Sequence, residues 1–199
     1  PGSLQSAKEA EVFSLNFLKK HIQLLAPGSR LENFKVTTNV LKNKMRMVGM
    51  KQFHQGVEVI GGQVHFKFKN NRLFVIGSEA LPNINLESIP IAPLSKDYYQ
   101  KKAEEWVAGD WNPQTIETEE VKDTQILPFI AKGGATQFFN VIEAVVNTTH
   151  PIGKWSVYLD TATGDPIARR QQLMFFEGTV KVNASDRWPG RGRINYPAM

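Results

Sequence analysis

The sequence predicts an α+β protein made of two similar small folds in tandem, each a helix followed by an antiparallel sheet of about four strands. Two stretches with helical spacing of apolar residues, 6–26 and 95–107, are each followed by segments in which apolar and polar residues alternate. A stretch with three prolines separates the two passes. We therefore divide the chain into a first module at 4–80, a Pro-rich linker at 81–94, a second module at 95–181 and a basic extended tail at 182–199.

The first helix is predicted from Ser6 to Ala26. Ser6 and Glu9 fit a capping box, in which both side chains accept hydrogen bonds from free backbone N–H groups at the helix start. Pro27-Gly28 ends the helix. We expect its apolar stripe to pack in a core, and the stripe consists of Phe13, Phe17, Leu18, Ile22 and Leu25.

After this helix the apolar period changes from 3.6 to 2. The alternation predicts strands at 34–38, Met45–His54, 57–60, 63–69 and 73–76. Gly61-Gly62 and Asn70-Asn71 are predicted to form hairpin turns, because glycine and asparagine adopt positive φ at low cost.

The second module repeats this order. Ser95 can cap a helix that runs to Val107 and stops at Gly109. The stretch Gly109–Thr124 is interpreted as a long polar connection. Strands are predicted at 125–131, 136–147, 154–160 and 167–176, with a turn at Gly133-Gly134, and Pro128 places the first strand at an edge or a bulge.

The composition is that of an ordinary globular protein, with 199 residues of which 41% are hydrophobic and 22% charged. The net charge is +5, and cysteine is absent, which excludes disulfides, Cys-ligated zinc, iron–sulfur clusters and a thiol nucleophile. No apolar run reaches the roughly 18–20 residues of a membrane span, so none is expected. No signal peptide opens the sequence, and Pro1-Gly2-Ser3 is typical of a cloning remnant.

No catalytic constellation stands out, so we expect no enzyme activity, no cofactor and no bound metal. G-x-S-x-G, Walker A and G-x-G-x-x-G motifs are all absent. A basic cluster at 67–72 and the Arg-rich tail could attract phosphates, but they lack the interleaved aromatic residues of an RNA-binding motif, so no nucleic-acid partner is expected. The four histidines lie in no metal-binding pattern: His21, His54, His65 and His150.

One segment carries a specific pattern: Gln52-Phe53-His54-Gln55-Gly56-Val57-Glu58-Val59-Ile60-Gly61-Gly62, followed by an alternating strand and the Asn70-Asn71 turn. It resembles the fungalysin/thermolysin propeptide motif, Q-x-x-x-G-V-x-V-x-G-G. The matching residues are Gln52, Gly56, Val57, Val59, Gly61 and Gly62. We expect Gly56 to let the chain bend between strands and Gly61-Gly62 to close the hairpin.

A second segment follows about one hundred residues later, at 155–167, and resembles a PepSY hairpin of the form W-x-V-Y-x-D-x-x-T-G-x. We expect Asp160 to accept hydrogen bonds from turn amides and Gly164 to adopt positive φ. Trp155 and Tyr158 are expected to pack. The matching residues, which we interpret as mainly structural, are Trp155, Val157, Tyr158, Asp160, Thr163 and Gly164.

In this order the two motifs resemble the propeptide region of secreted thermolysin- and fungalysin-type zinc metallopeptidases, over about Ser6 to Lys181. The resemblance implies two cystatin-like modules, each a helix cradled by a curved antiparallel sheet. It also implies a noncatalytic, secreted or periplasmic region that acts as intramolecular chaperone and inhibitor. Its partner would be a zinc metallopeptidase domain, encoded C-terminal to it or acting in trans. The tail then holds a candidate processing region at Arg187, Arg191 and Arg193.

Two other interpretations stay open on the sequence. The same folds could form a secreted or periplasmic noncatalytic binding module, with its partner site on an exposed sheet face. A small enzyme with an unrecognised site would depend on His54, His65 or His150. An H-E-x-x-H motif in the reading frame beyond Met199 would favour the propeptide interpretation.

Overall fold

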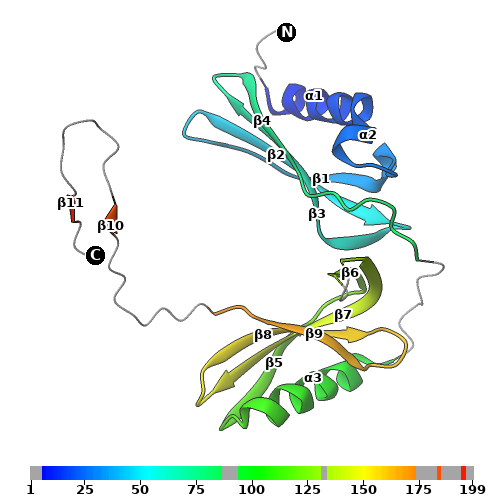
Figure 1. Cartoon of the computed structure of the whole chain (residues 1–199), viewed down its shortest axis with the longest axis vertical. Coiled ribbons are helices and arrows are strands. Elements are labelled where there is room, and N and C mark those ends of the chain that lie inside the picture. Colours follow the sequence, from blue (N-terminus) through cyan, green and yellow to red (C-terminus); the bar gives the residue numbers. More distant parts are fainter. Residues whose placement is uncertain (1–5, 87–93, 131–133, 174–182, 185–193, 196–199) are drawn as a thin grey trace.

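The computed structural model describes residues 6–86, 94–130, 134–173, 183–184 and 194–195 (Figure 1). We call residues 6–86 the first half and residues 94–173 the second half. The helices are α1 (Ala7–Lys20), α2 (Ile22–Leu25), the 3-10 helix η1 (Leu31–Asn33) and α3 (Lys96–Trp111). The strands are β1 (Phe34–Lys42), β2 (Met45–His54), β3 (Val57–Lys69), β4 (Arg72–Ser78), β5 (Thr115–Val121), β6 (Gln125–Ile130), β7 (Thr136–Thr149), β8 (Gly153–Asp160), β9 (Pro166–Gln171), β10 (Asn183–Ala184) and β11 (Ile194–Asn195). The predicted α+β class is confirmed.

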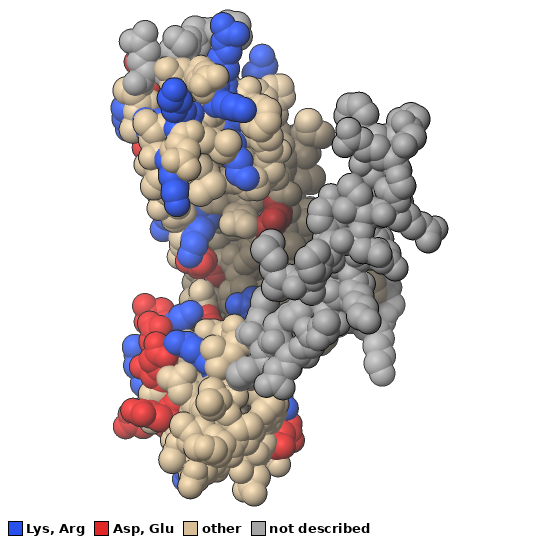
Figure 2. Space-filling model, turned by 90° about the vertical axis from the view of Figure 1, so that its left-hand side faces the viewer, with Lys and Arg blue, Asp and Glu red and all other residues tan. Residues whose placement is uncertain are grey.

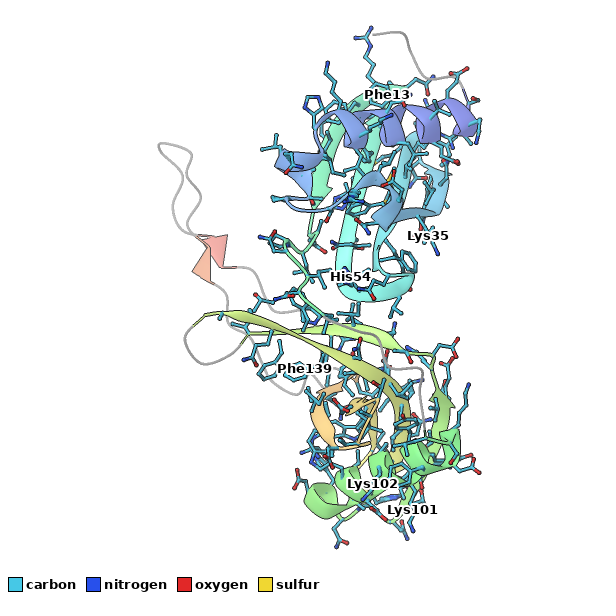
Figure 3. The ribbon with its side chains drawn as sticks, turned by 90° about the vertical axis from the view of Figure 1, so that its right-hand side faces the viewer. Phe13, Lys35, His54, Lys101, Lys102 and Phe139 are labelled. Carbon is cyan, nitrogen blue, oxygen red and sulfur yellow. The ribbon has the colours of Figure 1, made fainter. Side chains whose placement is uncertain are left out.

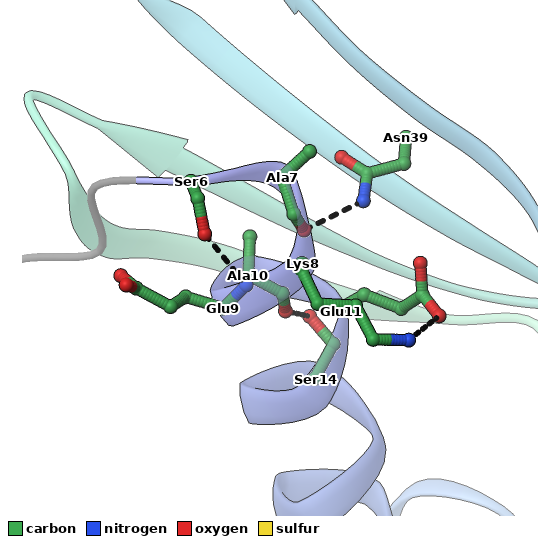
Figure 4. Close-up of polar contacts among 8 residues, drawn as sticks. All are labelled: Ser6, Ala7, Lys8, Glu9, Ala10, Glu11, Ser14 and Asn39. Carbon is green, nitrogen blue, oxygen red and sulfur yellow. Dashed lines mark hydrogen bonds and ion pairs between the residues drawn. The ribbon is translucent and has the colours of Figure 1, made fainter.

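The first helix begins at the predicted cap. Ser6 Oγ accepts a hydrogen bond from the Glu9 backbone N–H at 3.1 Å, and Asn39 of β1 donates to the Ala7 carbonyl at 2.8 Å (Figure 4). The first turn of α1 is therefore tied both to its own cap and to the sheet. The single helix predicted to Ala26 is interrupted at His21, which lies between α1 and α2.

The helix α1 packs on one face of the four-stranded sheet β1–β4. Phe13 lies edge-on against Phe68 at a ring-centroid distance of 5.8 Å, and Phe17 lies edge-on against Phe66 at 6.0 Å. Because side chains alternate along a strand, the residues between the buried ones face the other side of this sheet. The buried core of the first half consists of Ala10, Leu18, Ala26, Phe34, Val48, Met50, Val64, Phe66 and Phe68.

The turns of the first half confirm one prediction and correct another. Asn70-Asn71 joins β3 to β4 with φ of +50° and +59°. The predicted turn at Gly61-Gly62 is wrong: both residues lie inside β3, where the register against β2 shifts. The β2–β3 turn is instead Gln55-Gly56, with φ of +49° and +85°. Gly61 adopts φ of +78° within the irregular stretch, and a bulge uses glycine as readily as a turn does.

The second half corrects two further predictions. Helix α3 is capped by Ser95, as predicted, but it continues through Gly109 to Trp111 and ends at Asn112, which adopts the left-handed conformation at φ of +41°. Asparagine therefore fills the position at which glycine is more common. The stretch 109–124, interpreted as a connection, contains the end of α3 and the strand β5, which pairs antiparallel with β7.

Strands β6 to β9 form an antiparallel sheet. Pro128 lies in β6 beyond the two residues that pair with β3, which agrees with the predicted edge position. Strand β9 ends at Gln171, before the predicted end at residue 176, and residues 174–176 lie outside the described chain. Gly134 has φ of +83°, whereas Gly133 also lies outside the described residues.

One nine-stranded sheet runs through both halves. The link is a short parallel pairing in which Glu58 and Val59 of β3 lie opposite Gln125 and Ile126 of β6. Beyond the second half, β10 pairs antiparallel with β11. Within the described residues, the helices α1 and α3 each cover the sheet of their own half, as Figure 1 shows.

Candidate functional site

Gln52, the first residue of the first motif, forms a buried polar clamp. Its side chain is 1% exposed. The amide Nε2 donates to Ser29 Oγ at 3.1 Å and to the Leu81 carbonyl at 2.9 Å, and Oε1 accepts from the Leu81 N–H at 2.8 Å. Gln52 thereby holds the loop after α2 and the chain that leaves β4 against the end of the sheet.

The glycines of the first motif have two different physical roles. A Cβ at Gly62 would lie 2.6 Å from Gln52 Oε1 and 2.9 Å from Gln52 Cβ, so this position must stay bare for the clamp to form. A Cβ at Gly56 or Gly61 would meet open space, and these two positions require glycine for their positive φ.

The middle of the first motif lies where the two halves join. Val59 is buried and pairs with Ile126 of β6. His54 ends β2, and Figure 3 shows it at the end of the first half that faces the second half. His54 Nε2 and Gln125 Oε1 are buried without a hydrogen-bond partner among the described residues. The motif thus supplies backbone pairing at a junction that retains unsatisfied polar atoms.

The second motif forms the predicted turn after β8. Asp160 Oδ1 accepts hydrogen bonds from the backbone N–H groups of Ala162 at 2.8 Å and Thr163 at 3.0 Å. Thr163 Oγ1 in turn accepts from the Asp165 N–H at 3.1 Å. Gly164 has φ of +74°, and a Cβ there would lie 2.4 Å from the Tyr98 ring. The motif residues therefore fix this turn against the start of α3.

Trp155 packs as predicted, but with a partner that sequence reasoning missed. Its ring lies 4.9 Å from the Trp111 ring at the end of α3. The Arg169 guanidinium lies 5.2 Å from the Trp155 ring and 4.9 Å from the Trp106 ring, and it pairs with Asp110. A cation between two indoles joins β9 to α3. Only the alternation of β9 could have indicated that Arg169 faces the helix.

Val157 and Tyr158 are also buried, and Tyr158 joins the two motifs. It belongs to a small cluster with Leu127 and Val141, against which Ile60 from the first motif packs. Burial raises the pKa of the Tyr158 hydroxyl above its ordinary value near 10, and the facing Glu143 carboxylate raises it further. Contact between two motifs that lie about one hundred residues apart was not predicted.

A polar hollow of about 280 Å³ lies beside the Gln52 clamp. Arg30, Asn33, His54 and Asn83 are among its lining residues, and no carboxylate is. Hydrogen-bond donors and one permanent cation suit such a hollow to an anionic or carbonyl group better than to acid–base catalysis.

The remaining candidate residues are not brought together. His21 follows α1, His65 lies within β3, and His150 lies in the turn between β7 and β8. Within the described residues, no group of three or more His, Asp or Glu is placed to hold a metal ion, and no helix is long and apolar enough to cross a membrane. The candidate processing residues Arg187, Arg191 and Arg193 lie outside the described chain.

Comparison with known proteins gives matches among solved structures alone. No protein-family model matches the sequence, and no curated protein sequence matches it. Among solved structures, the chain is similar to the Bacillus megaterium YpeB C-terminal domain, with a TM-score of 0.40 and 13% sequence identity over 86% of this chain and 67% of that chain.

Proposed function

We propose that this chain is the noncatalytic propeptide region of a secreted or periplasmic zinc metallopeptidase, and that it is an intramolecular chaperone and inhibitor of a peptidase domain encoded C-terminal to it. The observation that carries the proposal is the pair of sequence motifs. Each of them occupies turns, a bulge and buried positions within its own helix-and-sheet half. We further propose that the two halves are cystatin-like modules in tandem.

The proposed function requires an ordered template. A propeptide that binds the late folding transition state of an enzyme lowers that barrier, and one that also binds the native enzyme occludes its cleft. The contacts of Gln52 with Ser29 and Leu81, and of Tyr158 with the junction cluster, support the proposal because they hold the folded surface in one arrangement.

The test begins with the reading frame beyond Met199, where we expect H-E-x-x-H within a following domain. The denatured peptidase domain is then refolded with and without the 199-residue chain, and the native peptidase is assayed with increasing amounts of the chain. We expect higher recovery of activity in the first assay and inhibition in the second. A frame without zinc ligands, together with no effect of the chain on the recovery or activity of any zinc metallopeptidase, would overturn the proposal.

A second candidate function is a noncatalytic secreted or periplasmic binding module with the same folds. The charge of the first sheet favours it: β1–β4 and their turns carry eight Lys and Arg side chains and one carboxylate, Glu58. Tight binding of a ligand other than a peptidase, with no effect on any zinc metallopeptidase, would support this function over the first.

A further inference from the structure

Two hairpins end side by side at one end of the first sheet, at the upper left of Figure 1. They join β1 to β2 and β3 to β4, and the pairing of Met45 with Lys69 places them next to one another. We call residues 40–47 and 67–75 the basic tip. It carries six cations and no carboxylate: Lys42, Lys44, Arg46, Lys67, Lys69 and Arg72.

Three cations of the basic tip lie in one row across the sheet. The end row of the sheet runs across four strands as Lys42, Met45, Lys69 and Arg72, in successive antiparallel pairs. Among the ion pairs that described residues form, only Lys51–Glu58, further along the sheet, uses a cation from β1–β4. The charge of the tip is therefore not neutralised within the described chain.

The basic tip also exposes large apolar side chains. Leu41 is 60% exposed and Phe74 is 62% exposed. Six of the twelve large hydrophobic side chains that are exposed among the described residues lie on this tip: Val40, Leu41, Met45, Met47, Phe74 and Val75. A gathering of exposed apolar side chains on a monomeric surface marks an interaction site more often than isolated ones do.

A hollow on the tip combines both features. It has a volume of about 430 Å³ and is lined by Lys69, Asn70, Arg72, Leu73 and Phe74. The Lys69 ammonium lies 5.9 Å from the centre of the Phe74 ring. Two cations and an amide beside an apolar ring offer an anionic group hydrogen-bond donors and, next to them, an apolar contact.

The two halves also differ in net charge. Residues 6–86 hold twelve Lys and Arg against five Asp and Glu, whereas residues 94–173 hold eight against eleven. On the face drawn in Figure 2, blue side chains accordingly dominate the upper part and most red side chains lie on the lower part. An anionic surface would attract the first half and repel the second, which orients the molecule with the tip toward that surface.

We propose that the basic tip docks the chain on an anionic phospholipid surface. Cations attract the phosphate groups, and the exposed Leu41 and Phe74 side chains can enter the boundary between headgroups and acyl chains. A nucleic acid would use the charge but leave the aliphatic side chains without a partner, since Phe74 is the only aromatic residue exposed on the tip. The inference does not depend on the proposed function.

The experiment uses the full chain and sedimentation with vesicles of phosphatidylcholine, with or without 30% phosphatidylglycerol. We expect binding to the anionic vesicles only, and weaker binding at 0.5 M salt because the attraction is screened. Each cation near such a surface contributes about a fivefold gain in partition. Lys69→Glu with Arg72→Glu should therefore lower the partition at least about 25-fold.

The matched control reverses the charge of two other lysines. Lys101 and Lys102 lie on α3, at the end of the molecule opposite the first half (Figure 3), and Lys101→Glu with Lys102→Glu should change the partition less than twofold. Leu41→Ser and Phe74→Ser alter exposed side chains, so the fold persists, and each should weaken binding about tenfold.

Three results would overturn the proposal. The first is no sedimentation with anionic vesicles at low salt. The second is an equal loss of binding in the tip variant and the α3 control. The third is undiminished binding of the Leu41→Ser and Phe74→Ser variants together with displacement of the vesicles by polyglutamate, because an acidic polymer or protein would then be the ligand.

Discussion

Replacing Gly62 by alanine tests whether the Gln52 clamp holds the first half together. The new Cβ would lie 2.6 Å from Gln52 Oε1 and 2.9 Å from Gln52 Cβ. Overpacking of this kind costs about 1–3 kcal/mol. If Gln52 shifts away, its buried amide or the groups at Leu81 lose their hydrogen bonds, which adds about 1–3 kcal/mol. A Gln52 side chain that shifts relieves the clash but loses its hydrogen bonds, so the two costs do not add in full. We therefore expect a loss of about 2–4 kcal/mol in the free energy of unfolding.

The matched control is Gly109→Ala. Gly109 lies inside α3, and a Cβ there would meet no atom within 4 Å. The same chemical change should therefore stabilise the protein by about 0.5–1 kcal/mol, because alanine favours a helix interior more than glycine does.

Urea denaturation followed by two probes measures both effects. Three of the four tryptophans, at positions 106, 111 and 155, lie in the second half, and the fourth follows it at position 188. Indole fluorescence therefore has no probe in the first half, whereas far-UV circular dichroism reports on both halves. The Gly62→Ala midpoint by circular dichroism should fall by about 1–2 M, given a slope of about 1–3 kcal/mol per molar urea. An unchanged midpoint in Gly62→Ala, or destabilisation by Gly109→Ala as large as that by Gly62→Ala, would refute the assignment of Gly62 to the clamp.

Three further predictions concern the second half. Arg169→Met should lose about 1–2 kcal/mol and alter indole fluorescence, because the cation leaves both indole rings, whereas the exposed Arg170→Met should do neither. Asp160→Ala should lose about 1–2 kcal/mol in urea denaturation through its two turn hydrogen bonds, while Asp165→Ala, whose side chain is exposed, should lose less than about 0.5 kcal/mol. Burial raises the pKa of Tyr158, so as the pH rises the tyrosine ionises in the unfolded chain before it does so in the folded one. Stability should therefore fall as the pH rises above about 10. In alkaline denaturation curves, Tyr158→Phe should reduce this loss of stability and leave the slope below pH 9 unchanged.

Each of these has a clear contrary result. Equal losses in Arg169→Met and Arg170→Met would mean that the indole stack contributes nothing beyond surface charge. Equal losses in Asp160→Ala and Asp165→Ala would assign the turn to the backbone alone. An alkaline slope of the same steepness in Tyr158→Phe would show that other groups dominate the pH dependence.

Local features of the fold could be predicted from the sequence because their causes are local. Ser6 and Ser95 cap helices through amides only three residues away, and the Asn70-Asn71 turn depends on two dihedral angles. Asp160 likewise accepts hydrogen bonds from the backbone N–H groups of residues two and three positions further along the chain. In these cases the residue type and its immediate neighbours determine the structure.

The errors arose where one residue type serves two structures. Glycine permits a turn, a bulge or a helix interior, so Gly61 and Gly109 could not be assigned from their identity. Strand β5 pairs with β7, and its three glutamate side chains lie in solvent. These glutamates made the segment look like a polar connection and hid its alternation of apolar and polar residues.

Long-range features of the candidate site could not be predicted at all. The pairing of β3 with β6 and the contact of Ile60 with the Tyr158 cluster join residues that are 60 or more positions apart. The contact of Arg169 with Trp106 spans a similar separation. The periodicity of one segment carries no information about which distant segment it will pack against.

Several motif residues are buried, whereas most of the charged side chains of the basic tip are exposed. This difference decides how variants should be interpreted. Gln52, Gly62, Trp155 and Tyr158 are buried, so a change at any of them alters stability first and any binding function only as a consequence. Lys69 is exposed at the end of β3, so reversal of its charge leaves the fold intact while changing what the surface attracts. A loss of function in motif variants with unchanged urea midpoints would therefore place the partner contact on the motifs themselves. A loss in tip variants alone would place it on the sheet end, where the sequence carries no motif.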